Sequence, residues 1–495
     1  MLNDDAELQR IATVIEAGPY QAEWSSLQEH TTPRWYLNGK FGIFIHWSLT
    51  SVPAFGSEWY SRLMYQEGTR EWQHHRETYG PQTEFGYKDF IPSFTNDRFE
   101  PDDWAALFRR SGAQFVVPVA EHHDGFAMYD SARSEWTAAK MGPRRDLFGD
   151  LAESVRRLGM VFGGSSHRAE HWFFMNGGMR SPSDVQDPKF ADFYGPASRE
   201  ETQPNEAYLD DWFLRTIEII DRYQPEVLWF DWWIEQEAFE PYLRKLAAYY
   251  YNSAVTWGRE VAINYKWTAF APGSAIYDIE RGAVAGIQPH FFQNDTSVSR
   301  TSWGWVEGHV YKPLSELIGE LVDVVAKNGA LLLNIGPKPD GTIPLEEQQL
   351  LEGIGDWLAV NGESIYGSRP WVIAGEGPTR AVEGSFIDGE VAPFTSQDIR
   401  FTSFSHVSGE YLFAIALAWP EGGTFSIKAL GYGSGLLTVD IDEVHILGVR
   451  GKVEWTQSWD RLDITLPETP PSEVGVVAKI KLKAPKPPVR GDAIH

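Results

Sequence analysis

Short apolar runs recur between Phe41 and Pro337 and predict buried β-strands. The seven predicted strands are Phe41–Trp47, Gln114–Asp124, Met160–His167, Glu226–Trp233, Glu260–Lys266, Ala275–Glu280 and Ala330–Pro337. Stretches with apolar residues at a 3.6-residue period lie between these runs and predict amphipathic helices, as at 101–113, 145–159 and 208–223. Alternation of strands and helices over this length indicates an α/β fold with a parallel sheet.

Polar and ionisable residues stand at the carboxyl ends of several predicted strands: His46, His122, His123, His167, Asp231 and Glu280. Barrel enzymes collect their catalytic residues at this end of their strands. A glycine-rich phosphate loop, which would indicate a nucleotide-binding open sheet, follows none of the predicted strands. The pattern therefore predicts a TIM-like (β/α)-barrel catalytic domain over residues 1–367.

The hydrophobic pattern changes after residue 367. Short alternating runs separated by Gly, Pro and Asp fill the chain from Trp371 to Leu482 and predict a C-terminal antiparallel β-sandwich over residues 368–482. The Pro-rich, polar residues 483–495 are predicted to form a disordered tail.

Composition narrows the functions that this fold can serve. The chain has 43 Lys and Arg against 69 Asp and Glu, a formal charge of −26, which argues against nucleic acid and anionic membranes as partners. Cysteine is absent, which excludes disulfides and thiol catalysis. The acidic N-terminal segment lacks the apolar core of a secretory signal, so we expect a cytoplasmic protein. The oligomeric state is not determined by the sequence.

Asp231 is the first candidate for chemistry, because it stands in the apolar segment PEVLWFDWW. Burying a carboxylate is costly unless it is hydrogen-bonded or used. A helix N-cap is an equally simple interpretation of the residue itself. The flanking Trp229, Trp232 and Trp233 favour a sugar pocket, which combines hydrophobic walls with few polar groups.

Two further segments carry polar groups next to aromatic ones. EHHDGF contains His122, His123 and Asp124, and GSEWY contains Glu58 and Trp59. Histidine and aspartate suit a zinc site, but adjacent residues of an extended segment point in opposite directions, so we expect no metal ion here. Hydroxyl recognition suits neutral imidazoles better. His74 and His75, in REWQHHRE, are predicted to lie on a solvated helix face.

If the sugar pocket around Asp231 belongs to a glycosidase, the enzyme needs a second carboxyl group, which protonates the leaving oxygen. Glu280, in YDIERG at a predicted strand end, and Glu307, in the loop SWGWVEG, are the two candidates. The structural alternatives are an ion pair between Glu280 and Arg281, and an exposed loop position for Glu307.

Taken together, FGIFIHW, SEWY, EHHDGF, LWFDWW, SWGW and DVVAKNGALLLNIGPKPDGTIP resemble the family 29 α-L-fucosidases. The resemblance runs from about Trp35 to Tyr366, in the family's order. It implies a barrel followed by a β-sandwich, net retention at the anomeric carbon, a fucosylated oligosaccharide or glycoconjugate as substrate, and no cofactor.

The resemblance also implies roles for individual residues. Asp231 matches the family's nucleophile within a W-x-D pattern that includes Trp229. The positions that hold the fucose hydroxyls, or lie beside them, are His46, Glu58, Trp59, His122 and His123. Arg281 and Arg300 compete for the place of an arginine near the sugar.

Two departures from the family pattern affect these roles. Relatives have Trp-Glu where this chain has Phe292-Gln293, so the general acid is chosen by position: Glu280 first and Glu307 second. His171 separates Glu170 from Trp172, so Glu170 takes no role from the resemblance.

The sequence therefore predicts a retaining exo-α-L-fucosidase that forms a covalent glycosyl intermediate on Asp231. The alternatives are a non-catalytic relative that binds fucose- or galactose-type sugars, a barrel glycosidase for a galactose-configured sugar, and a metal-dependent hydrolase that uses His122, His123 and Asp124.

Overall fold

The computed structural model describes residues 3–379, 383–387 and 392–483. These residues belong to two compact units. The first comprises the chain up to Gly282, His290–Lys312 and Ala330–Glu352. The second comprises Ala283–Pro289, Pro313–Gly329 and the chain from Gly353 onward.

Eight strands close into a barrel in sequence order, and β1 pairs in parallel with both β2 and β8. The strands are β1 (Phe41–Ile45), β2 (Phe115–Glu121), β3 (Val161–Ser166), β4 (Val227–Phe230), β5 (Ala262–Tyr265), β6 (Ile276–Glu280), β7 (Phe292–Ser297) and β8 (Gly329–Ile335). Seven were predicted from apolar runs. β7 was missed because its sequence, FQNDTS, is polar although all six residues are buried.

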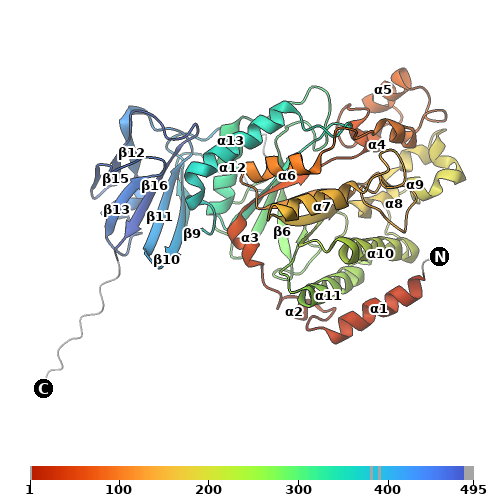
Figure 1. Ribbon diagram of the computed structural model, residues 1–495, viewed down its shortest axis with the longest axis horizontal. Helices are drawn as coiled ribbons and strands as arrows, with labels where there is room; N and C mark the ends of the chain where they lie inside the picture. The colour runs from red at the N-terminus through yellow and green to blue at the C-terminus, as the bar shows by residue number, and fades with distance from the viewer. Residues whose placement is uncertain (1–2, 380–382, 388–391, 484–495) are drawn as a thin grey trace. The chain divides into compact units, whose positions relative to one another are not determined.

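Helices follow most of the barrel strands (Figure 1). The longer ones are α6 (Pro101–Arg110), α7 (Leu147–Arg157), α10 (Glu206–Tyr223), α11 (Glu240–Trp257), α12 (Leu314–Ala326) and α13 (Leu345–Asn361). The remaining ones are α1 (Asp4–Ala17), α2 (Trp24–Leu27), α3 (Arg34–Gly39), α4 (Tyr60–Leu63), α5 (Arg70–Thr78), α8 (His171–Phe174) and α9 (Ala191–Tyr194). Loops 266–275 and 281–291 join β5, β6 and β7.

The C-terminal strands form two antiparallel sheets, as predicted. One has the order β13-β16-β11-β10-β9 and the other β12-β15-β14. They are β9 (Arg369–Glu376), β10 (Ile399–His406), β11 (Gly409–Ala416), β12 (Thr424–Ile427), β13 (Ile441–Ile446), β14 (Trp455–Gln457), β15 (Leu462–Thr465) and β16 (Val476–Leu482). Side chains from both sheets, including Phe401, Phe425 and Ile480, share one hydrophobic core.

The predicted domain boundaries, 1–367 for the barrel and 368–482 for the β-sandwich, remain predictions. Of the predicted tail, residues 484–495 lie outside the described residues. The solvated face predicted for His74 and His75 is wrong for His75, which is fully buried because its ring bonds the Tyr60 hydroxyl and the Phe85 carbonyl.

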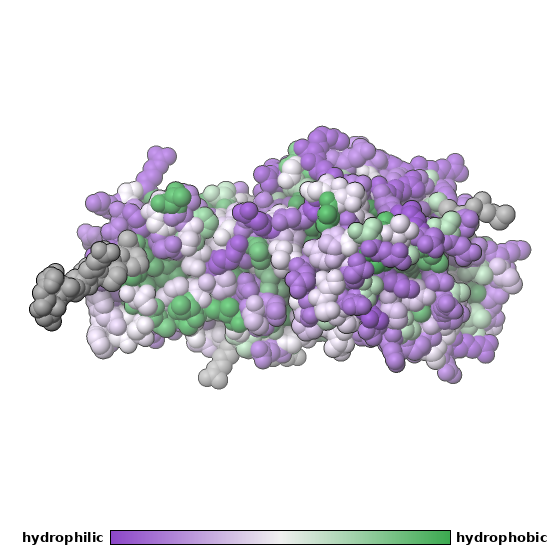
Figure 2. Space-filling model, turned by 90° about the horizontal axis from the view of Figure 1, so that it is seen from below, coloured by the Kyte–Doolittle hydropathy of each residue, from purple (hydrophilic) through white to green (hydrophobic). Residues whose placement is uncertain are grey.

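The surface is mostly hydrophilic where Figure 2 shows it. Hydrophilic side chains predominate on the face drawn in Figure 2, with smaller hydrophobic areas between them. Among the described residues, no helix is both long and apolar enough to span a membrane.

Candidate active site

The carboxyl ends of the barrel strands bring the candidate residues to one end of the barrel. His46 directly follows β1, Asp231 directly follows β4, and Glu280 is the last residue of β6. His122 and His123 follow β2, and His167 follows β3. Because neighbouring strands run parallel, these side chains share the end at which barrel enzymes carry out their chemistry.

Asp231 lies between two histidines. Its Oδ2 is 2.9 Å from His167 Nδ1 and 3.3 Å from His123 Nε2, and its Oδ1 accepts a 2.9 Å hydrogen bond from the Trp232 amide. Burial alone would raise the pKa of Asp231, but the hydrogen bonds from His123 and His167 hold this pKa well below its ordinary range. Asp231 is therefore a buried but ionised carboxylate.

His123 is an imidazolium, because both of its ring nitrogens face acceptors. Nδ1 is 2.8 Å from the His167 carbonyl and 3.3 Å from Glu170, and Nε2 faces Asp231. Burial by itself would lower the pKa of His123, but the charge of Glu170 and the hydrogen bond and charge of Asp231 raise it to about 9. Its positive charge explains how Asp231 stays ionised away from water.

His46 and His122 are neutral. His46 Nδ1 is 2.7 Å from Asn334 Oδ1, an acceptor, so the proton is on Nδ1 and Nε2 keeps a lone pair. His122 Nδ1 is buried without a hydrogen-bond partner among the described residues. Burial lowers the pKa of both rings well below the ordinary value. Neutral rings of this kind can exchange hydrogen bonds with sugar hydroxyls.

Glu58 and Trp59 are neighbours in the sequence but contact different groups. Glu58 Oε2 accepts hydrogen bonds from Ser302 Oγ at 2.8 Å and from the Trp303 amide at 3.0 Å. The Trp59 ring is 5.6 Å from that of His123, and its neighbours include Phe174 and Trp232. This side of the site is therefore largely apolar.

Glu280 is held by a lysine that the sequence analysis did not select. Lys266, which directly follows β5, has its Nζ 2.9 Å from Glu280, 3.1 Å from Asp278 and 3.0 Å from Asp295. The same ammonium lies 4.9 Å from the centre of the Trp229 ring. A lysine that ends the apolar run EVAINYK was the available signal, because a buried lysine needs carboxylate partners.

The three carboxyl groups around Lys266 cannot all be ionised at little cost, because one cation faces three acids in a buried place. Burial and the charge of Asp278 raise the pKa of Asp295 well above its ordinary value. Burial also raises the pKa of Glu280; Lys266 opposes this shift and the charge of Asp231 adds to it. The surroundings of Asp231 and Glu280 therefore shift the pKa values of these two carboxyl groups in opposite directions.

The other sequence candidates lie in different surroundings. Arg281 has its guanidinium 4.6 Å above the Trp303 ring and donates a hydrogen bond to the Ser299 carbonyl at 3.1 Å. The side chains of Arg300 and Glu307 are exposed. The backbone amide of Arg300 bonds Val310, and that of Glu307 bonds Ala54.

Glu170 is a second residue to which the sequence analysis gave no role. It is buried beside His123, and burial raises its pKa to about 7, with the charge of His123 opposing the shift. The sequence pattern could not predict this contact, because Glu170 and His123 follow different strands.

The residues that could hold a metal ion differ from the set predicted for a metal-dependent hydrolase, which was His122, His123 and Asp124. Among the described residues, two groups could surround an ion: His46, His122 and His167, or His123, His167 and Asp231. Asp124 belongs to neither, because it accepts hydrogen bonds from the Tyr87 hydroxyl and the Phe126 amide. Both ring nitrogens of His167, which the two groups share, already have partners in Asp231 and Ser165.

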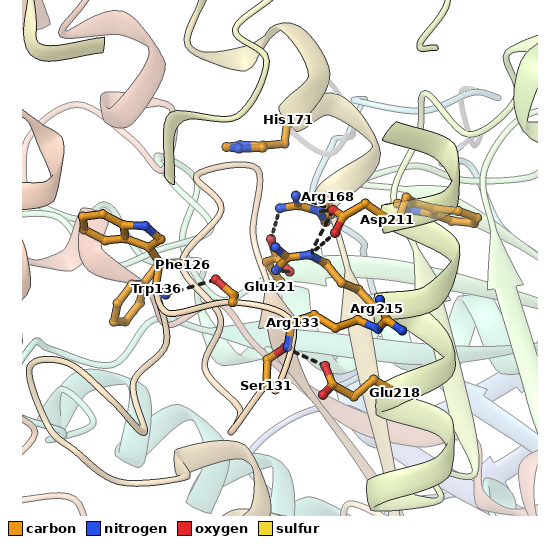
Figure 3. A network of polar contacts seen from close by, with 12 residues as sticks. Glu121, Phe126, Ser131, Arg133, Trp136, Arg168, His171, Asp211, Arg215 and Glu218 are labelled. Carbon is orange, nitrogen blue, oxygen red and sulfur yellow. Dashed lines mark hydrogen bonds and ion pairs between the residues drawn. The ribbon is translucent and has the colours of Figure 1, made fainter. Parts of the chain in front are cut away.

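A buried charge network holds the ends of β2 and β3 in place (Figure 3). Glu121, the last residue of β2, bonds Arg168, which directly follows His167. Arg168 bonds Asp211 of α10 at 2.7 Å, and Arg215 bonds both Asp211 and Glu121. Two acids balance two arginines, so the network fixes His122, His123 and His167 without a net buried charge.

Comparisons with known proteins match nearly the whole chain. The family model described as "Alpha-L-fucosidase" matches residues 7–363, and the model "Alpha-L-fucosidase C-terminal domain" matches residues 392–483. Human tissue α-L-fucosidase is 32% identical over 466 residues, covering 92% of this chain and 89% of the human protein. Human plasma α-L-fucosidase is 30% identical over 450 residues, covering 86% and 88%.

A crystal structure of Thermotoga maritima α-fucosidase in complex with a mechanism-based inhibitor superposes with a TM-score of 0.75. It is 29% identical to this chain and covers 93% of this chain and 100% of its own. The resemblance inferred from the motifs is therefore confirmed, and the chain belongs to the α-L-fucosidase family of glycoside hydrolases.

Proposed function

We propose that the protein releases terminal α-L-fucose from oligosaccharides or glycoconjugates with net retention, using Asp231 as nucleophile and Glu280 as acid and base. The observation that carries the proposal is the contrast between these two carboxyl groups. Asp231 is kept ionised by two histidines, whereas burial and the charge of Asp231 raise the pKa of Glu280 and so favour its protonated form. Two titratable groups whose surroundings push their pKa values apart form an acid–nucleophile pair.

The reaction follows as a double displacement. In the first step, an Asp231 oxygen attacks the anomeric carbon while the bond from that carbon to the leaving oxygen breaks. The leaving oxygen takes the electron pair of that bond and a proton from Glu280. In the second step, Glu280 takes a proton from water, the water oxygen bonds the anomeric carbon, and Asp231 departs.

The neutral polar groups at the barrel end supply hydrogen bonds for the fucose hydroxyls. His46 Nε2 accepts, His122 offers its unpartnered Nδ1, and the Trp229 Nε1–H is buried without an acceptor among the described residues. Trp59 and its aromatic neighbours offer an apolar wall for the methyl group of fucose. A fucose complex of the Thermotoga maritima enzyme, 29% identical with a TM-score of 0.73, supports fucose as the sugar that is bound.

Lys266 is a positioning residue in this mechanism. Its ammonium contacts Glu280, Asp278 and Asp295 at 2.9–3.1 Å and so holds the Glu280 carboxyl group in place. A cation beside the acid also stabilises Glu280 after it has given up its proton.

The direct test is Asp231→Gly with an aryl α-L-fucoside. Loss of the nucleophile should lower turnover by about 10³-fold or more. Azide should then restore part of the turnover, because it fits the space of the missing carboxylate and attacks the anomeric carbon. A folded Asp231→Gly variant that keeps wild-type turnover would contradict the proposal.

A further inference from the structure

A pocket of about 460 Å³ lies beside the carboxyl ends of β4 and β5. One wall is formed by the segment that follows Asp231, including Glu235, and another by β5 and its loop, including Tyr265, Trp267 and Phe270. Helices α2 and α11 complete the lining, with Trp24 on α2. This volume is within the range of small-molecule sites in proteins.

Two features connect this pocket to the reaction centre. Glu235, four residues after Asp231, lines the pocket, and its pKa is raised by burial and by the charge of Asp231. Trp267 directly follows Lys266, the residue that holds Glu280. Glu280, at the end of β6, protonates the leaving oxygen and contacts Lys266, at the end of β5, so the leaving group departs on the side of β5 and β6.

The lining has the chemistry of a sugar site. Trp267 is 61% exposed, and its backbone has φ +59°, a conformation that non-glycine residues rarely adopt. Trp24 and Phe270 pack edge to face at 5.6 Å, and Tyr265 lies 5.2 Å from Phe270. Aromatic faces of this kind stack on the C–H surfaces of pyranose rings.

The polar groups of the lining select against negative charge. Glu235, Glu237 and Glu240 are its acidic residues, and Lys and Arg are not among the residues that line it. Glu235 Oε2 is buried and accepts no hydrogen bond from the described residues. Carboxylates accept hydrogen bonds from hydroxyl groups and repel anions, so a neutral sugar fits and an acidic one does not.

We propose that this pocket is a subsite for the sugar to which the fucose is attached, a neutral pyranose that stacks on Trp267 and donates hydroxyl hydrogen bonds to Glu235. The inference rests on the proposed fucosidase activity. It explains how the enzyme obtains binding energy from the leaving group, which a small aryl fucoside does not provide.

The test compares kcat/KM for a neutral fucosyl oligosaccharide and for an aryl α-L-fucoside in wild type and Trp267→Ala. We expect the oligosaccharide value to fall about fivefold and the aryl fucoside value to stay within about twofold of wild type. Trp267→Tyr keeps an aromatic face and should recover most of the loss. Trp459→Ala, which removes a 71% exposed tryptophan of the C-terminal unit, is the matched control and should change neither value.

A second variant approaches the pocket differently. Ala271→Trp fills it while Trp267 stays in place, and it should lower the oligosaccharide value selectively in the same way. Equal losses on both substrates, or no loss in either variant, would overturn the subsite. Failure of the proposed function is recognised separately, because wild type would then hydrolyse neither substrate.

Discussion

Glu280 and Glu307 were both candidates for the proton donor, and the structure places them in different surroundings. Glu280 is buried, pairs with Lys266 and feels the charge of Asp231. Glu307 is exposed, on a loop whose amide bonds Ala54. A proton donor needs a raised pKa, and burial supplies this for Glu280.

Replacing Glu280 by alanine should therefore have an effect that depends on the leaving group. For fucosides with poor leaving groups, which need protonation, we expect turnover to fall by about 10²- to 10⁴-fold. For an activated aryl fucoside, the first step should be nearly unchanged, and azide should replace the missing base in the second. Glu307→Ala, the matched control, should stay near wild type on every substrate. Equal losses of Glu280→Ala on all leaving groups would remove Glu280 from the role.

At the scale of elements, the barrel was predictable where its strands are apolar and not where they are polar. β1 and β8 are continuous apolar runs, so their burial could be read from the sequence. β7 could not, because its polar residues are satisfied by other elements: Gln293 bonds Tyr36 of α3 and Asp278 of β6, and Asp295 bonds Lys266, which follows β5. These contacts also hold Lys266 in place, which explains why sequence patterns found Asp231 and Glu280 but not the lysine at the end of β5.

Lys266→Met tests whether this polar core of β5, β6 and β7 serves the reaction. Without the ammonium, three buried carboxyl groups lose their cation, and the pKa of Glu280 rises further. Because loss of the Glu280 proton ends activity at high pH, the alkaline limb of the kcat/KM profile should move to higher pH by about one unit or more, and kcat should fall. Lys266→Arg should restore much of the wild-type profile.

The matched control for this variant is Lys327→Met, which removes another buried ammonium, paired with Asp323 at 2.6 Å in the C-terminal unit. Both methionine variants should be destabilised, by about 3–5 kcal/mol for a broken buried pair. Only Lys266→Met should move the pH profile. A profile that stays in place while stability falls would give Lys266 a purely structural role.

At the scale of the whole molecule, burial raises the pKa of several acids in a chain of formal charge −26. Burial raises the pKa of Asp124 to about 6 and that of Glu347 to about 8. An acid whose pKa is raised in the folded state stabilises the fold below its unfolded pKa, and this contribution is lost as pH rises through the folded value. These groups should therefore make the protein less stable in mildly alkaline solution than near pH 5.

Glu347 offers the clearest measurement of this effect, because it is fully buried at the start of α13 while its neighbour Glu346 is exposed. Its Oε2 accepts a 3.0 Å hydrogen bond from the Gly336 amide at the end of β8, which opposes the rise in pKa without cancelling it. Between its ordinary pKa of 4.5 and about 8, the free energy of unfolding should fall by about 4 kcal/mol on account of this group.

Glutamine has the shape of the protonated acid but cannot ionise. Glu347→Gln should therefore remove that fall, so the stability difference between wild type and variant, measured by urea unfolding, should shift toward the variant from pH 5 to pH 8. Glu346→Gln should show no such shift, and a difference for Glu347→Gln that is the same at both pH values would mean that the folded protein does not keep this acid protonated.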